Sequence, residues 1–343
     1  MTLFYFTLLV LATLFWGYLF YKRDYHPQPL KVILKSFGVG LFSMVPVFAY
    51  KTLYQQFLPQ LSEFRIFRPL LDSPFLAGTL VFVANLILLS IVLFGLSAII
   101  SLILNFFSHA TLINLKNALK QEPLGFTAVS LLLGLSVFIQ QWILETWGSP
   151  LLASILGTIL FLAIIEEYIK HLIVRITDDK QLKDIDDAIT LSIIVGLAFA
   201  FIETIIYSLS AASISIIFYR MLVSLPIHVV ASGIFGYYYG LAHFSLLRRG
   251  FGGQANYHIN LWGMGRHGWL HRILTLKKST VYSEEKIVEG ILFATLFHAA
   301  MNLLFEFNLG VIAVPFIIAG LVLIARLYAV SQQEQRKIRY KVA

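Results

Sequence analysis

The chain has 343 residues, of which 58% are hydrophobic and 13% are charged, and its mean hydropathy is +0.80. Soluble domains average about 45–50% apolar and about 25% charged residues, so the composition argues against a soluble enzyme, a disordered chain or a nucleic-acid-binding protein. The net charge of +8 suits the basic cytoplasmic loops of a membrane protein. We therefore expect a lipid bilayer, and no nucleic acid, as a partner. Cysteine is absent, which excludes disulfides, a thiolate nucleophile and a cysteine-rich metal site.

Nine segments are apolar over a length that can cross a membrane, for which about 20 residues are needed. The first has no basic residues before it and no cleavage site after it, so we interpret it as a retained span and not as a signal peptide. The seventh contains Pro226, near which we expect a break. These segments predict an all-α polytopic membrane protein with about nine transmembrane helices, at 3–20, 33–54, 76–105, 126–145, 150–175, 188–209, 213–246, 287–308 and 310–330.

Basic residues predict the orientation of these helices. Lys22 and Arg23 follow the first span, which indicates that this loop is cytoplasmic and that the N-terminus lies outside. Alternation from there places the basic loop 247–286 and the basic C-terminal tail in the cytoplasm, so the prediction is N-out/C-in. We divide the chain into N-terminal transmembrane helices at 1–125 and a transmembrane core at 126–343, which includes the basic loop at 247–286.

Ionisable side chains interrupt four of the predicted spans in the second half of the chain. Such a residue near the centre of a span costs roughly 2.5–3.5 kcal/mol on insertion scales and is a functional hypothesis by default. Counting at about 1.5 Å per residue from the predicted cytoplasmic ends places them all in the middle third of a ~30 Å apolar core, so they can meet at one site. They are Glu166, Glu167, Lys170, Glu203, His228 and His298, with Asn302 beside the last.

The spacing of these residues supports one shared site. Glu166 and Lys170 are four residues apart, so they share a helix face and can pair. The same spacing puts His298 and Asn302 on one face. Small residues let neighbouring helices approach closely in a membrane, and three glycines follow His228, at positions 233, 236 and 240.

A metal ion is the simplest way to balance this set of residues. A single buried His or Glu is more often an interhelical hydrogen-bonding group than a ligand. The three glutamates together, however, cost roughly 8–10 kcal/mol to insert. Only Lys170 is available to balance them, together with Arg220 if it turns toward a carboxylate and does not extend to the membrane surface, a choice that the sequence leaves open. Without cysteine, two histidines and a carboxylate form the ligand set of a catalytic zinc site. The motif HExxH is absent, so the usual zincin helix is excluded, and the aspartyl signature GxGD is absent as well. Zinc is the expected ion, and other divalent ions remain an alternative.

The order of these motifs resembles the PrsW family of intramembrane metalloproteases, which is related to CAAX prenyl proteases and bacterial Abi membrane proteins. The resemblance covers the first two spans and residues 150–308. The segment after the first span, with Asp24, Pro27 and Pro29, is similar to the corresponding PrsW segment. The motifs are EEYIK at 166–170 for EExxK, Phe199 to Glu203 for FxxxE, His228 with its trailing glycines, and His298 to Asn302 for HxxxN/D.

The resemblance implies an activity and a role for each residue. It implies a membrane protease of a bacterial or archaeal cell membrane, whose substrate is a membrane protein, expected to be single-pass and of the anti-sigma-factor kind. The implied roles are zinc binding by Glu203, His228 and His298, general base for Glu166, a shared base or ligand role for Glu167, carboxylate positioning by Lys170, and a hydrogen bond from Asn302 to a ligand or to the oxyanion.

Other functions stay open at this point. An ion- or proton-coupled transporter or channel could use the same residues, although the polar set has no counterpart in the first half of the chain. A non-catalytic protein that binds a membrane helix is a second alternative. A CAAX-type enzyme is a third, with Glu203 standing where that family usually has histidine. Residues 76–126 have no counterpart in the PrsW resemblance, and an extra helix pair and an interfacial helix are the two alternatives for them. We interpret the 247–286 loop, with its tryptophans, histidines and basic residues, as an interfacial segment and not as a second metal site.

Overall fold

The computed structural model describes residues 2–49, 123–178, 181–210, 218–247 and 278–342, together with the single residues Thr52 and Val83. Every regular element in these ranges is a helix. Seven helices are long and apolar enough to cross a membrane, so the chain is a multi-pass, all-α integral membrane protein, as predicted. The predicted span at 76–105 lies outside the described residues, and α8 is not among the seven. The number nine, the N-out/C-in orientation and the division at residue 125 therefore stay predictions.

The helices agree with the predicted spans except at some ends. The second span is interrupted at Phe42, after which helical turns resume. Two helices, α13 and α14, extend well beyond the predicted apolar runs, because a helix can continue with polar residues where it leaves the apolar layer. The elements are α1 (Thr2–Tyr21), α2 (Leu30–Leu41), α7 (Pro123–Trp147), α8 (Pro150–Asp178), α9 (Ile185–Ser210), η2 (Arg220–Ser224), α11 (Leu225–Leu247), α13 (Lys278–Glu306) and α14 (Gly310–Val342).

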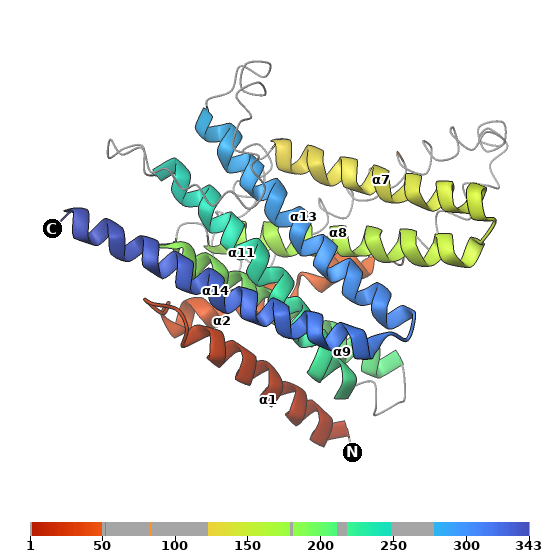
Figure 1. Ribbon diagram of the computed structural model, residues 1–343. Helices are drawn as coiled ribbons and strands as arrows, with labels where there is room; N and C mark the ends of the chain where they lie inside the picture. The colour runs from red at the N-terminus through yellow and green to blue at the C-terminus, as the bar shows by residue number, and fades with distance from the viewer. Residues whose placement is uncertain are drawn as a thin grey trace.

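Two helices form the centre of the bundle. α11 packs against α9 on one side and α13 on the other, and α8 contacts α7, α9 and α13 (Figure 1). In the spans that contain α9 and α11, 78% and 83% of the residues are buried, against 17% for α1 and 22% for α14. Large apolar side chains such as Leu14 and Val311 point away from the bundle on those two outer helices. We infer that α1 and α14 face lipid, whereas α8, α9, α11 and α13 enclose the polar residues.

Glycine brings α9 and α11 into close contact, as the sequence predicted. A Cβ atom on Gly236 would lie 2.6 Å from the backbone oxygen of Ala188 and 2.8 Å from Cα of Ile189, so only glycine fits the α11 backbone against the α9 backbone here. Gly196 on α9 has the converse role, because its Cα faces Ser232 of α11. This contact sets the register between the helix that carries Glu203 and the helix that carries His228.

The break expected near Pro226 takes the form of a π-helical turn. η2 precedes α11 directly, and the backbone N–H of Leu225 donates to the carbonyl of Arg220, five residues earlier. Proline has no N–H, and in an α-helix its ring clashes with the carbonyl four residues before it, which for Pro226 is that of Leu222. A π-turn relieves such a conflict without ending the helix. The turn also places Arg220 toward α9.

Candidate active site

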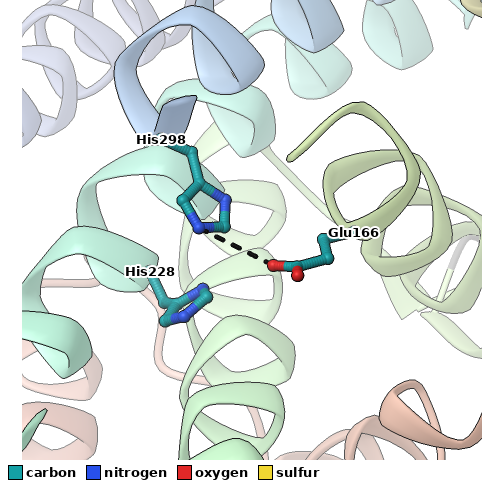
Figure 2. Close-up of side chains that lie close together, drawn as sticks. All are labelled: Glu166, His228 and His298. Carbon is teal, nitrogen blue, oxygen red and sulfur yellow. Dashed lines mark ion pairs between the residues drawn. The ribbon is translucent and has the colours of Figure 1, made fainter. Parts of the chain in front are cut away.

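The predicted polar residues meet between four helices. α8 supplies Glu166, Glu167 and Lys170, while α9, α11 and α13 each supply one residue. Figure 2 shows three of these side chains, Glu166, His228 and His298, turned toward one another. All of these side chains are buried in the bundle. These residues, which the rise per residue places at one depth, therefore lie together as one cluster in the structure. Its members are Glu166, Glu167, Lys170, Glu203, His228 and His298.

Glu166, His228 and His298 form the part of the cluster that can hold a metal ion. Each offers one ligand atom, and these atoms all lie within 4.8 Å of one another. Nε2 of His298 is 3.6 Å from Oε2 of Glu166, and the two imidazole rings are 4.8 Å apart between centroids, nearly edge to face. Oε2 of Glu166 is buried and accepts no hydrogen bond within the described part of the chain. A buried carboxylate oxygen without a donor is costly, and a cation at this place would remove the cost.

Glu167 orients His298. Its Oε1 lies 2.7 Å from Nδ1 of His298 and 2.6 Å from Nζ of Lys170. An ionised carboxylate can only accept, so Nδ1 of His298 carries a proton, and Nε2, on the side of Glu166, is the nitrogen available to a metal. This is the carboxylate–histidine arrangement that fixes the tautomer of a metal-binding histidine.

Lys170 and Glu203 hold His228 from its two sides. Nζ of Lys170 is 2.9 Å from Nδ1 of His228, and Oε2 of Glu203 is 3.0 Å from Nε2. A charged lysine can only donate, so Nδ1 is the acceptor and Nε2 carries the proton that Glu203 accepts. Phe199, the aromatic residue of the FxxxE motif, packs against both Lys170 and His228, and Nζ of Lys170 lies 4.6 Å from the centre of its ring. Binding of a metal at Nε2 would require that this proton leaves.

Arg220 pairs with Glu203. Its Nη2 atom lies 2.6 Å from Oε2 of Glu203, and its guanidinium carbon stands 4.2 Å above the ring of Tyr207. The sequence left open whether Arg220 neutralises a carboxylate or extends toward the membrane surface, and the structure shows the first. An arginine in an apolar stretch was the available signal, but the sequence did not identify its partner.

Two expected contacts are arranged differently. Lys170 pairs with Glu167, three residues before it, and not with Glu166 as the i, i+4 spacing predicted. The reason is that His298 and Lys170 both converge on Oε1 of Glu167. Asn302 lies one turn after His298 on α13 and is partly buried; within the described ranges the structure records no hydrogen bond between its amide and the cluster. The histidines of the 247–286 loop lie outside the described residues.

The donor set fits a catalytic divalent metal. Two histidines and a carboxylate are a common three-ligand zinc set, which leaves a fourth position for water or substrate. The tautomer of His298 and the oxygen of Glu166 that accepts no hydrogen bond are both suited to a cation. Lys170 and Arg220 provide positive charge at the edge of the cluster, so the group retains charge balance when the other glutamates are ionised.

Comparison with known proteins agrees with this geometry. Residues 122–330 match a family model described as PrsW family intramembrane metalloprotease. A curated relative, Protease PrsW of Geobacillus kaustophilus (strain HTA426), is 28% identical over 165 residues, which cover 46% of this chain and 71% of the relative. No solved structure matches the chain. Because the matched region includes α8, α9, α11 and α13 and therefore the whole cluster, the chain belongs to the PrsW family of intramembrane metalloproteases, which are hydrolases acting on peptide bonds.

Proposed function

We propose that this protease hydrolyses a peptide bond of a membrane protein by a zinc-dependent mechanism in the middle of the bundle. The observation that carries the proposal is the buried convergence of Glu166, His228 and His298, with ligand atoms within 4.8 Å of one another. The proposed substrate is a single-pass membrane protein of the anti-sigma-factor kind. A cluster enclosed by α8, α9, α11 and α13 suits a substrate helix that enters from the bilayer.

The two histidines are the proposed zinc ligands, together with one glutamate. When bound, zinc lowers the pKa of a coordinated water to about 7 and polarises the peptide carbonyl. Glu167 contacts Nδ1 of His298 at 2.7 Å, so it orients the ring and leaves Nε2 as the nitrogen that would bind the metal. Lys170 stabilises the charge of Glu167 and contacts His228, so it positions both helices at the site.

Two assignments of the ligand and general-base roles are compatible with the positions of the glutamates. In the first, which the family motifs suggest, Glu203 is the third ligand and Glu166 is the general base. Its support is the 3.0 Å separation between Glu203 and Nε2 of His228. In the second, Glu166 is the ligand, and its support is the metal-binding group that Glu166 forms with the histidines, while Glu203 is held by Arg220. We favour the first as the working assignment, with Asn302 as a donor to the oxyanion.

Metal content and cleavage, measured on the same variants, test the proposal. The purified protein, reconstituted with zinc, is analysed by elemental mass spectrometry and then mixed with a reporter that has one transmembrane helix. We expect near-stoichiometric zinc in the wild type and none in a His228→Ala/His298→Ala double variant. Glu166→Gln should retain zinc and lose cleavage, whereas Glu203→Gln should lose both. The reverse pattern would assign the ligand role to Glu166.

A matched control separates these effects from the loss of a carboxylate in general. Glu289 on α13 pairs with Lys286 at 2.7 Å, away from the cluster, so Glu289→Gln should retain both zinc and cleavage. A wild type that binds no zinc, and in which Glu166→Gln leaves cleavage unchanged, would contradict the zinc mechanism.

A further inference from the structure

Three aspartates form a second group of candidate ligands at another place in the bundle. Asp24 follows α1, and Asp184 and Asp187 lie at the start of α9. Each offers one carboxylate oxygen, and these oxygens lie within 4.8 Å of one another. Asp24 is 5% exposed and Asp187 is fully buried. At a rise of about 1.5 Å per residue, Asp187 is about 24 Å from Glu203 along α9, so the group is separate from the histidine cluster.

Helix capping explains part of this arrangement. Oδ1 of Asp184 accepts the backbone N–H of Asp187 at 3.0 Å, and Oδ2 of Asp187 accepts that of Lys183 at 2.7 Å, as residues at a helix N-terminus commonly do. Asp24 accepts one backbone N–H and one threonine hydroxyl, both at 3.0 Å. These bonds fix the direction of each carboxylate, but they bring no full positive charge to the group.

Asp187 provides the independent sign of a ligand. Its Oδ1 atom is buried and accepts no hydrogen bond among the described residues. The amide of Gln28, which donates to the backbone carbonyl of Gln181 at 3.1 Å, also interacts with the Asp187 carboxylate, but it brings no charge to the group. Because a buried carboxylate oxygen without a partner is costly, capping alone does not account for the position of Asp187.

Three close carboxylates make the group strongly negative. Among the described residues, an ion pair joins Nδ1 of His26 to Oδ2 of Asp184 at 3.4 Å, and the His26 side chain is 41% exposed. Burial and the negative charge of Asp187 raise the pKa of the Asp24 carboxyl to about 7. Close carboxylates that share a site require either a proton or a cation.

We propose that Asp24, Asp184 and Asp187 bind a hard divalent cation, Mg²⁺ or Ca²⁺. Only oxygen ligands are present, and these are the ligands that both ions prefer. With metal–oxygen distances of about 2.0–2.6 Å, oxygens on opposite sides of the ion lie about 4–5 Å apart, which the observed spacing allows. The cation joins the α1–α2 connection to the first turn of α9.

A hydrogen-bonded chain extends this connection to α14. Oγ1 of Thr190 donates to Asp24 and lies 2.9 Å from the hydroxyl of Tyr328; because Thr190 has one proton to give, Tyr328 donates to it. The proposed cation therefore holds together three segments, of which α1 and α14 are the outer helices. Its role is structural and does not depend on the proposed zinc chemistry.

Titration of the purified full-length protein with CaCl₂ and, separately, MgCl₂ tests the proposal by calorimetry and by the melting temperature. The protein is first treated with a chelator and kept in detergent. We expect saturable binding of at least one of the two ions and a rise in melting temperature, because a ligand of the folded state stabilises it. Asp24→Asn should weaken binding by about tenfold or more, since the affinity of such sites follows the number of charged ligands. Glu289→Gln, which removes a carboxylate elsewhere, should bind as the wild type does.

Two further measurements keep the two metal proposals separate. The His228→Ala/His298→Ala double variant should lose zinc but keep the response to Ca²⁺ or Mg²⁺. Should Asp24→Asn not fold, Tb³⁺ emission sensitised by Tyr328 in the wild type should appear and be displaced by Ca²⁺. Absence of binding of both ions at about 10 mM, well above the usual range for protein Ca²⁺ sites, would overturn the proposal. So would an Asp24→Asn variant with wild-type affinity, or Tb³⁺ emission that Ca²⁺ does not displace.

Discussion

Arg220 and Glu203 form an ion pair inside the bundle, with 2.6 Å between Nη2 and Oε2. The same oxygen of Glu203 accepts the Nε2 proton of His228. The arginine therefore controls the charge of a residue that is also in contact with the proposed metal site. Because η2 carries Arg220 directly before α11, the π-helical turn connects the position of this charge to the helix that carries His228.

Replacement of Arg220 by methionine should destabilise the protein. It leaves Glu203 buried without its cation, and breaking a buried ion pair from one side costs about 3–5 kcal/mol. We expect a lower melting temperature in detergent, measured by intrinsic fluorescence. Arg220→Lys retains the charge and should recover part of the loss. An Arg220→Met variant that melts with the wild type would show that another group neutralises Glu203.

Glu167→Gln should weaken metal binding without removing a proposed ligand. The amide does not hold the Nδ1 proton of His298 as a carboxylate does, and it leaves Lys170 without its counter-ion. Changes at a residue that orients a metal-binding histidine typically cost about 10–100-fold in affinity or activity. Zinc affinity measured by competition with a fluorescent chelator gives the first number, and cleavage of the transmembrane reporter gives the second. Wild-type values for both would contradict the orienting role of Glu167.

Gly236→Ala should separate α9 from α11. The added methyl group would lie 2.6 Å from a backbone oxygen of α9, where no side chain can move aside. Overpacking of this kind costs about 1–3 kcal/mol, and we expect a lower melting temperature together with slower cleavage, because His228 shifts relative to Glu203.

Gly38→Ala is the control for this substitution. A Cβ atom on Gly38 of α2 would meet nothing within 4 Å, and alanine is favoured over glycine in a helix by about 1 kcal/mol. Gly38→Ala should therefore be neutral or stabilising. Equal destabilisation by the two substitutions would mean that the glycines matter for backbone flexibility and not for the contact between α9 and α11.

Asn302→Ala tests the role proposed for the last motif residue. If the amide donates to the oxyanion, its removal should slow cleavage by about 100-fold and leave both zinc content and melting temperature unchanged. Single-turnover cleavage at saturating enzyme measures the chemical step separately from substrate binding. Loss of zinc in this variant would instead place Asn302 in the support of His298.

The sequence predicted those features that depend on position along a helix. Apolar runs located the helices, and the rise per residue placed Glu166, Glu203, His228 and His298 at one depth. Contacts between individual side chains were harder to predict from the sequence. Glu166 and Glu167 are adjacent, so about 100° of rotation around α8 decides which of them meets Lys170, and this rotation follows from the packing of α8 against its neighbours.

Contacts between residues that are far apart in the chain also could not be predicted from the sequence. The sequence identified Arg220 as unusual but did not connect it to Glu203. Asp24 was noted only as part of a family-like segment, and its hydrogen bond with Thr190 joins residues 166 positions apart. Such contacts depend on how α1, α9 and α14 pack, and no local pattern encodes that packing.

The distribution of charge among the helices has a consequence for biogenesis. α8 carries Glu166 and Glu167, whereas His298, which contacts both, lies on α13, near the end of the chain. Glu203 on α9 likewise precedes Arg220. During synthesis α8 and α9 therefore emerge before His298 and Arg220, and Lys170 on α8 is the basic partner in this cluster that emerges with the glutamates. The proposed site therefore needs α13 in place beside α8, α9 and α11 before it is complete. We expect a chain that has not yet inserted α13 to lack both zinc and cleavage.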